Sequence, residues 1–391
     1  MQTVRIGIVG VGNMGSAHAH CIRSGRVGGL SLTALCDNDP KRLQYCREAF
    51  PEVACYLDLR DMLASGRVDA VIVAVPHRLH AAIASQALEN GLHVLVEKPI
   101  DVSVSVAARL NAVAKASGRV FGIMFNQRTN PLFARARDIV QSGGIGQLKR
   151  TSWTVTNWYR TQAYYDSGSW RATWAGEGGG VLLNQAPHNL DIWQWICGMP
   201  VAVMGFCSVG KYHNIEVEDE AVLHVRYENG AIGTFITSTG EYPGVNRLEI
   251  VGDGGLLVLE KGRLCYTRLC TSEREVCFDS PEGMPSIPCE ETVYTPDGAE
   301  TAHAGILQNF ANAIRFGEPL LAPGYEGVAE LSLSNAAYLS AWEDNRWVEL
   351  PFDDAHFDEL LRQRRAASRY RTAENPESLS EGYNARWQVN W

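Results

Sequence analysis

The stretch Val4-Arg5-Ile6-Gly7-Ile8-Val9-Gly10-Val11-Gly12-Asn13-Met14-Gly15 decides the fold class of this 391-residue chain. A short apolar run of the β type leads directly into a G-x-G-x-x-G turn that opens a helical pattern. In a dinucleotide-binding turn the first glycine permits the tight bend, the second admits a pyrophosphate against bare backbone, and the third lets helix and strand pack closely. The helix N-terminus adds N–H groups and partial positive charge. The stretch therefore predicts cofactor contacts from Gly10, Gly12, Asn13, Met14 and Gly15.

A lone glycine turn is weak evidence, so the second strand matters. Residues 30–36 read as a strand that ends in Asp37, at about the distance where an acidic residue binds the 2′-hydroxyl of the adenosine ribose. A carboxylate there repels a 2′-phosphate, which predicts NAD rather than NADP as the cofactor. Arg42 lies about one helical turn further on and partly counters that repulsion.

Later strands of the same half end in residues suited to a ligand cleft. Residues 69–75 form a continuous apolar run, which is typical of strands buried on both faces of a parallel sheet. Ligands of such sheets bind beyond the carboxyl ends of the strands. The βα array closes at about residue 126, and we predict further cofactor contacts from Val75, Pro76, His80, Glu97 and Lys98. For His80, a helix-start histidine with a local hydrogen bond is an equal alternative.

The stretch GGGVLLNQAPHNLD, residues 178–191, brings polar side chains onto one line. If it is helical, Asn184, His188 and Asp191 stand one turn apart on a shared face. Pro187 lacks an N–H, so either the regular helix begins near Asn184 or it bends at the proline. Glycines without side chains let another segment or a flat ligand approach the backbone. Taken alone, the stretch is better explained as a buried helix with one satisfied histidine, and the rest of the chain reverses that preference.

The segment 160–174 is dense in aromatic residues interleaved with polar ones. Such a mixture suits the apolar faces and hydroxyl rims of a pyranose ring, although an Ω-type loop pinned by its own aromatics is the alternative. We predict substrate contacts from Lys98, Asn126, Asn157, Tyr164, Tyr165, Trp170, Arg171, Trp174, Asn184 and His188.

The glycine turn, Asp37, Glu97-Lys98-Pro99 and the triple glycine followed by His188 together resemble the Gfo/Idh/MocA family of sugar and polyol dehydrogenases, over residues 3 to 350. The resemblance implies an N-terminal Rossmann domain and a C-terminal α/β domain. The large, mostly antiparallel sheet of the second domain would carry the substrate site and often the subunit contacts. It also implies that Lys98 and His188 occupy the catalytic lysine and histidine positions. Many relatives carry Asp four residues before the histidine, where this chain has Asn184. Without that charge, His188 is expected to titrate near or below about 6.5.

The domain organisation follows from a change of periodicity. Residues 1–126 are predicted as the NAD-binding Rossmann domain, with a doubly wound parallel sheet. Residues 127–350 are predicted as the substrate-binding and oligomerisation α/β domain, because strands without intervening helices after residue 201 fit an antiparallel sheet. Residues 351–391 form a C-terminal extension whose aromatic end docks on a neighbouring subunit or near a site, or is tethered to its own surface.

Composition narrows the possible partners. A net charge of −9 without a basic cluster argues against nucleic acid and anionic membranes. No apolar run approaches the roughly 20 residues that span a bilayer, which predicts a cytoplasmic address. The ten cysteines include no C-x-x-C pair, so we interpret them as reduced thiols and expect no metal site.

The sequence thus predicts an NAD-dependent dehydrogenase that oxidises a secondary hydroxyl of a cyclic sugar, glycoside or polyol. His188 acts as general base, Lys98 binds the reacting oxygen, and Asn184 orients the substrate. A homo-oligomer, dimer or tetramer, is expected from the resemblance. The alternatives are a keto-sugar reductase and a glycosidase that oxidises its substrate transiently on bound NAD. A non-catalytic NAD-binding regulator is less favoured, because it needs no joint Lys98 and His188.

Overall fold

The computed structural model describes residues 3–168, 170–296 and 301–369. Its N-terminal half contains a six-stranded parallel sheet with the order β3-β2-β1-β4-β5-β6. This order belongs to the doubly wound dinucleotide-binding fold, whose two halves meet between β1 and β4. The predicted fold class of this half is confirmed. The strands are β1 (Val4–Val9), β2 (Leu30–Cys36), β3 (Ala54–Tyr56), β4 (Ala70–Val73), β5 (His93–Val96) and β6 (Phe121–Ile123).

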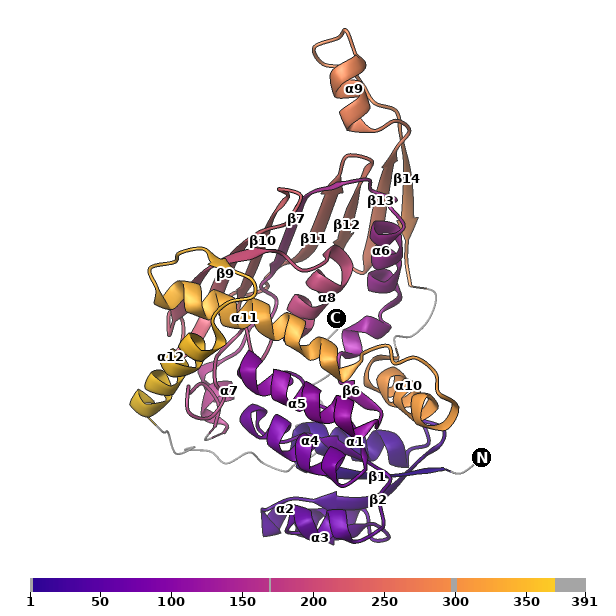
Figure 1. Ribbon diagram of the computed structural model, residues 1–391, viewed down its shortest axis with the longest axis vertical. Helices are drawn as coiled ribbons and strands as arrows, with labels where there is room; N and C mark the ends of the chain where they lie inside the picture. The colour runs from indigo at the N-terminus through magenta and orange to yellow at the C-terminus, as the bar shows by residue number, and fades with distance from the viewer. Residues whose placement is uncertain (1–2, 169, 297–300, 370–391) are drawn as a thin grey trace.

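Helices alternate with these strands and cover the sheet (Figure 1). Val71 and Ile72 on β4 have no exposed surface, as expected for a strand covered on both faces. The strand ends at Val73, so Val75 and Pro76 belong to the turn beyond it. The helices are α1 (Asn13–Arg23), α2 (Pro40–Ala49), α3 (Leu59–Ala64), α4 (His80–Glu89) and α5 (Val104–Ser117), with the 3-10 turn η1 (His77–Leu79) before α4.

A second, nine-stranded sheet has the order β14-β13-β12-β11-β7-β10-β9-β8-β15. Within this sheet, β7 and β10 are the only strands of the described residues that pair in parallel, so the sheet is mostly antiparallel, as expected. The strands are β7 (Leu148–Val155), β8 (Ala202–Val209), β9 (Glu218–Arg226), β10 (Ile232–Ser238), β11 (Asn246–Gly252), β12 (Gly255–Glu260), β13 (Arg263–Leu269), β14 (Cys289–Tyr294) and β15 (Val348–Glu349).

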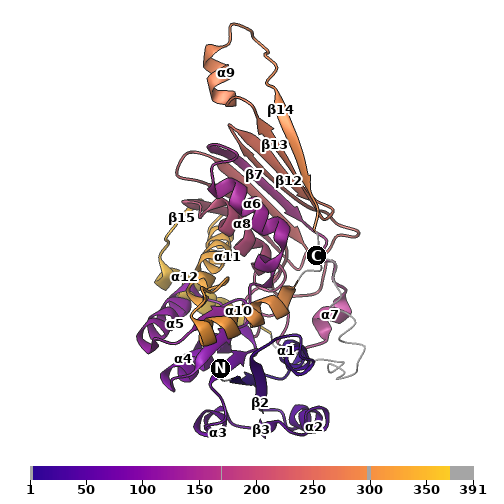
Figure 2. The same cartoon turned by 90° about the vertical axis from the view of Figure 1, so that its right-hand side faces the viewer.

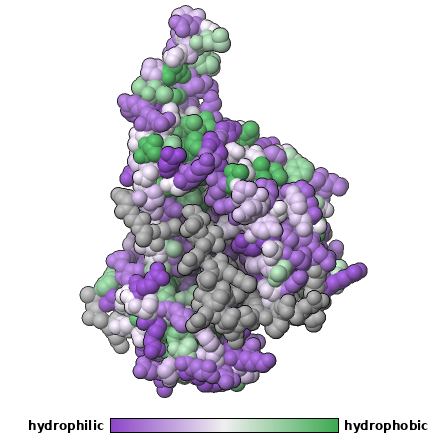
Figure 3. Space-filling model, turned by 180° about the vertical axis from the view of Figure 1, so that it is seen from behind, coloured by the Kyte–Doolittle hydropathy of each residue, from purple (hydrophilic) through white to green (hydrophobic). Residues whose placement is uncertain are grey.

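One face of this sheet is covered by helices, and the other is open. Figure 2 shows α6 (Pro131–Gln141), α8 (Pro187–Cys197) and α11 (Gly327–Trp342) on the same side. On β7, Trp153 and Val155 face these helices and are buried, whereas Ser152 and Thr154 point the other way and are half-buried. Figure 3 shows apolar and polar residues mixed across the opposite side of the molecule. The subunit contacts implied by the resemblance stay a prediction.

The C-terminal helices return to the first sheet and join the two halves. Helix α10 (Ala302–Phe316) packs on the turn η2 (Asn126–Thr129) and on β1, and α11, which follows the turn η3 (Gly324–Glu326), packs on α5. Helix α12 (Asp354–Ala367) packs against α5, where Asp358 accepts hydrogen bonds from Ser103 and Ser105 at 2.5 and 2.6 Å. The described part of the predicted extension therefore packs on its own chain, whereas the aromatic end of the extension lies outside the described residues.

Three features differ from the sequence prediction or were missed by it. The regular central helix α8 begins at Pro187, and residues 180–186 form turns closed by hydrogen bonds to Gly180 and Val181. Proline suits the first helical position because no N–H is required there. The sequence analysis also missed the segment that contains β3 and α3, and it missed the projecting arm of α9 (Glu273–Asp279) and β14 that follows the predicted strand β13 (Figure 1). Within the residues that the structure describes, no helix is long and apolar enough to cross a membrane.

Candidate active site

A single cleft of about 570 Å³ runs from the glycine turn after β1 to the start of α8. Residues of both halves line it. Of the predicted cofactor contacts, all but Gly15 lie on its wall: Gly10, Gly12, Asn13, Met14, Asp37, Val75, Pro76, His80, Glu97 and Lys98. Of the predicted substrate contacts, Lys98, Tyr164, Trp170, Arg171, Asn184 and His188 line the same cleft.

The glycines of the first turn are required by close backbone approach. Gly10 has φ +87°, and a Cβ there would lie 2.4 Å from the carbonyl oxygen of Ala74. A Cβ on Gly15 would lie 1.9 Å from the carbonyl oxygen of Gly10, so this residue packs helix α1 onto the turn and does not line the cleft. Gly12 stands at the N-terminus of α1, beside the guanidinium of Arg42. The turn is a bare-backbone cradle of the kind that a dinucleotide pyrophosphate requires.

Asp37 holds the adenosine end of the cleft. Its Oδ2 accepts the N–H of Val11 at 2.7 Å, and its Oδ1 accepts the N–H of Asp39 at 2.9 Å. Each oxygen keeps a further lone pair for a ribose hydroxyl. The residues present therefore fit NAD.

Glu97 and His80 line the cleft but already have partners in the protein. The Nε2 atom of His18 lies 2.6 Å from Oε1 of Glu97. Burial alone would raise the pKa of Glu97, but the hydrogen bond and charge of His18 bring it to about 2. His80 faces two backbone carbonyls, those of Pro99 and Val75, each at 2.7 Å. The structure thus supports the local hydrogen-bonding role for His80 alongside its place on the cleft wall.

Lys98 crosses the cleft. Its Nζ donates to the backbone carbonyl oxygen of Asn184 at 2.7 Å. Burial lowers the pKa of Lys98, and the carboxylates of Glu97, Glu330 and Glu177 oppose that shift. The ammonium is thereby held at the point where the two halves of the chain meet.

His188 is the second residue of α8 and is 6% exposed. Burial lowers its pKa well below 6.5, and the positive charge of Lys98 lowers it further. This is the direction expected from the absence of a carboxylate at residue 184. Phe125 packs edge-on against the ring, with centroids 6.5 Å apart. The imidazole is therefore neutral and able to accept a proton at neutral pH.

The side chain of Asn184 has a partner within the protein. Its Nδ2 donates to Oε1 of Glu177, a buried residue directly before the triple glycine. Asp191, predicted on the same face, is turned away and forms a fully buried ion pair with Arg128 at 2.6 Å. The shared face does not form, because residues 180–186 are turns and α8 begins after them.

Part of the aromatic segment lines the cleft opposite Lys98. The guanidinium of Arg171 lies 4.8 Å from the ring centroid of Tyr164 and 4.7 Å from that of Trp170. It also donates to the hydroxyl of Tyr164 at 2.9 Å. His77 packs edge-on against Trp170 at 5.5 Å between centroids. The wall combines ring faces with hydrogen-bonding groups.

Four predicted substrate residues lie elsewhere. Trp174 packs against Tyr338 and Trp342, with centroids 5.5 Å from each. Asn157 is exposed and lies against Gly244 rather than in the cleft. Asn126 is fully buried, and its amide atoms have no hydrogen-bond partner among the described residues. None of these residues, and not Tyr165, lines the cleft.

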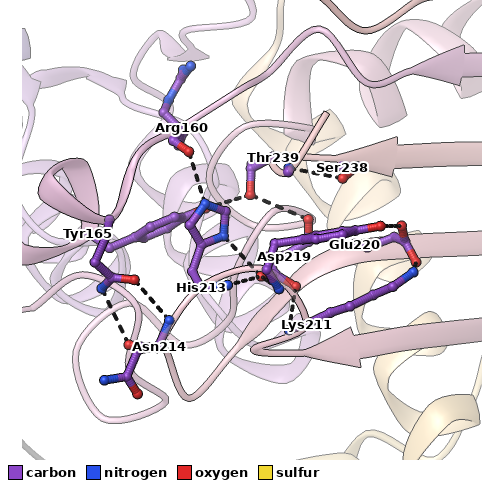
Figure 4. A network of polar contacts seen from close by, with 12 residues as sticks. Arg160, Tyr165, Lys211, His213, Asn214, Asp219, Glu220, Ser238 and Thr239 are labelled. Atoms are coloured by element: carbon purple, nitrogen blue, oxygen red, sulfur yellow. Dashed lines mark hydrogen bonds and ion pairs between the residues drawn. The ribbon is translucent and has the colours of Figure 1, made fainter. Parts of the chain in front are cut away.

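Tyr165 instead helps to anchor the aromatic segment to the second sheet (Figure 4). Its hydroxyl lies 2.7 Å from Oγ1 of Thr239, and its ring lies 4.8 Å from that of His213. The Nδ1 atom of His213 lies 3.0 Å from Oδ2 of Asp219, and its Nε2 atom lies 2.9 Å from the carbonyl oxygen of Arg160. The Ω-type explanation therefore holds for Tyr165, which fixes a segment whose neighbours reach the cleft.

Several cleft residues were missed by sequence reasoning. The additional residues on the wall include His77, Trp158, Arg160, Gln185 and His303. His77 follows Pro76 at the end of a buried strand, which is a usable signal, whereas His303 comes from a distant helix that no local pattern connects to the cleft. Within the described residues, no group of three His, Cys, Asp or Glu is arranged to hold a metal ion.

Comparison with known proteins agrees with this geometry. Residues 4–125 match the family described as "Oxidoreductase family, NAD-binding Rossmann fold", and residues 133–258 match "GFO/IDH/MocA C-terminal domain". The chain belongs to the Gfo/Idh/MocA family. It is an NAD-dependent oxidoreductase.

Relatives in this family have recorded activities. A levoglucosan dehydrogenase of Pseudarthrobacter phenanthrenivorans is 25% identical over 90% of this chain and 99% of its own. A 1-carboxy-3-chloro-3,4-dihydroxycyclo hexa-1,5-diene dehydrogenase of Comamonas testosteroni is 28% identical over 64% of this chain, and the match spans 61% of that relative. The solved WlbA dehydrogenase from Bordetella pertussis, in complex with NADH and UDP-GlcNAcA, is similar over 90% of this chain and all of its own, at 26% identity and a TM-score of 0.75.

Proposed function

We propose that this protein oxidises a secondary hydroxyl of a cyclic sugar, glycoside or polyol with NAD. One observation carries the proposal: the dinucleotide turn and the group formed by Lys98, His188 and the aromatic wall line the same cleft. A substrate held against that wall would present a ring carbon beside the cofactor. Bound NAD would supply the hydride acceptor.

His188 is proposed as the general base. A neutral, buried imidazole can accept the hydroxyl proton, and its lowered pKa keeps it unprotonated at neutral pH. The same shift makes it a weak base, so the hydroxyl must be made more acidic. Lys98 does this, because an ammonium beside the reacting oxygen stabilises alkoxide character.

The aromatic wall is proposed to select the substrate class. Tyr164 and Trp170 offer ring faces, and Arg160, Arg171 and Gln185 offer hydrogen-bond donors beside them. A cyclic molecule with several hydroxyls presents matching apolar faces and polar rims. The relatives named for levoglucosan and for a dihydroxylated carbon ring support this class. Keto-sugar reduction uses the same residues in reverse, and the cytoplasmic address and homo-oligomeric state stay predictions.

The experiment is a substrate screen with purified protein. NAD is incubated with hexoses, inositols, anhydrosugars, glycosides and acyclic hydroxy acids while reduced nicotinamide is followed by absorbance. Turnover of a cyclic polyol that falls about 10²-fold or more in His188→Gln supports the proposal. Turnover confined to acyclic hydroxy acids would refute the assigned substrate class, and near-normal turnover of His188→Gln would remove its role as base.

A further inference from the structure

Glu177 is a buried carboxyl group that the mechanism above does not use. It directly precedes the triple glycine, is 1% exposed and does not line the cleft. Its Oε2 accepts the N–H of Ala172 at 2.7 Å, and its Oε1 accepts Nδ2 of Asn184. Because each oxygen accepts an N–H, the contacts favour the ionised form.

The charges around this carboxylate belong to the active site. Burial raises the pKa of Glu177 above its usual value, and Arg171, the two N–H donors and Lys98 offset part of that rise. On the other side, Lys98 is faced by Glu97, Glu330 and Glu177, with Arg171 opposing them. Glu97 has the largest effect of the three on Lys98, and its Oε1 lies 2.6 Å from Nε2 of His18.

We propose that Glu177 is a positioning residue for the oxidation: its carboxylate holds the Asn184 amide and, through Asn184, fixes the ammonium of Lys98 in the cleft. The inference rests on the proposed function. Asn184 carries the effect in two ways, because its side chain binds Glu177 while its backbone carbonyl accepts Nζ of Lys98 at 2.7 Å.

A purely structural role for Glu177 is the competing explanation. Ala172 has φ +58°, a left-handed conformation that is costly for alanine, and the carboxylate of Glu177 holds its N–H. Loss of Glu177 could therefore loosen the loop that carries Arg171. Experiment can separate the two roles, because Ala172→Gly removes the backbone strain at residue 172 without restoring the negative charge of Glu177.

The main experiment compares Glu177→Gln with the wild-type enzyme across pH. Removing a negative charge near Lys98 lowers the pKa of its ammonium, so the alkaline limb of kcat/KM should move down by about one pH unit. A second readout needs no substrate: the pH dependence of reductive methylation of Lys98, followed by mass spectrometry. Its midpoint should fall in the same direction while NAD affinity changes less than about threefold.

Three further variants decide between the explanations. Glu177→Gln combined with Asn184→Asp returns a carboxylate to the pair and should restore both pH midpoints. Glu177→Gln combined with Ala172→Gly should recover thermal stability but leave the midpoints shifted. Glu216→Gln is the matched control. The carboxylate of Glu216 accepts a hydrogen bond from the hydroxyl of Ser368, and Glu216 is not among the groups that shift the pKa of Lys98.

Recovery of the midpoints by Ala172→Gly, or no shift in Glu177→Gln, would overturn the inference. If Glu177→Gln is too unstable to purify, the double variant Glu177→Gln with Asn184→Asp remains decisive. A purely structural role for Glu177 predicts that this double variant is also unstable. Absence of sugar turnover would defeat the proposed function, whereas the methylation midpoint still tests Glu177.

Discussion

The Nζ atom of Lys98, at the end of β5, donates to the backbone carbonyl of Asn184, just before α8, at 2.7 Å. This hydrogen bond joins residues that lie 86 positions apart in the sequence. It ties the nucleotide-binding sheet to the helix that carries His188. Any change at either end is therefore expected to alter the relative placement of cofactor and substrate.

Replacing Lys98 by alanine should lower kcat by about 10²- to 10³-fold, because the alkoxide loses its cationic partner. NAD affinity should change by less than about fivefold, since the glycine turn and Asp37 remain. Steady-state kinetics and cofactor titration measure the two effects. Lys115→Ala, an exposed lysine on α5, serves as control. A larger effect on NAD binding than on kcat would reassign Lys98 to the cofactor.

The choice of cofactor should depend on the charge of Asp37. We expect kcat/KM for NAD to exceed that for NADP by at least about tenfold. Asp37→Asn should narrow the gap, because the amide oxygen can still accept the N–H of Val11 but does not repel a phosphate. Arg42→Ala should widen it, since Arg42 lies beside Gly12 and pairs with Asp39 at 3.8 Å. Equal use of both cofactors by the wild-type enzyme would contradict the assignment.

Gly180, the last residue of the triple glycine, must be a glycine because its backbone lies close to that of Glu218. A Cβ on Gly180 would lie 1.9 Å from the carbonyl oxygen of Glu218. Gly180→Ala must displace β9 and should lower the free energy of unfolding by about 2 kcal/mol or more, with loss of activity. Gly283→Ala meets nothing within 4 Å and is the control. Chemical denaturation of both variants measures the difference, and equal stabilities would show that the loop adapts.

Stability should depend on pH through Glu218. This fully buried carboxyl group accepts N–H bonds from Gly180 and Leu182, and burial raises its pKa to about 7. Between pH 4.5 and 7 the folded state retains a proton that the unfolded chain has released, so this group reduces stability as pH rises. The slope approaches ~1.4 kcal/mol per pH unit.

Denaturation of Glu218→Gln at several pH values tests this dependence. The variant lacks the titrating proton, so its unfolding free energy should decline less from pH 4.5 to 7 than that of the wild-type protein. Glu228→Gln, an exposed position after β9, should retain the wild-type slope. Parallel profiles for all three proteins would mean that Glu218 stays ionised throughout.

Sequence patterns were enough to predict the fold class and the nucleotide-binding end of the cleft. Apolar strands, the glycine turn and Asp37 are local patterns whose spacing alone specifies backbone geometry, and they reappear at β1, α1 and β2. The cleft positions of Lys98 and His188 could be predicted for a similar reason. Lys98 follows a strongly patterned strand, and His188 lies near the start of a strongly patterned helix. Local pattern also explains the errors at Trp174 and Tyr165, since an aromatic side chain in a loop suits a core as well as a ligand.

The pairing of the polar residues around His188 could not be predicted from local sequence patterns. Asp191 forms an ion pair with Arg128, and the side chain of Asn184 bonds to Glu177. The two residues do not share a helix face, because α8 begins at Pro187 and Asn184 lies in the turns before it. His303 reaches the cleft from α10, more than 100 residues beyond α8. Such pairings depend on which buried charge lies nearest in space, and burial makes each partner obligatory. The order of residues along the sequence does not show which charged residues lie close together in space.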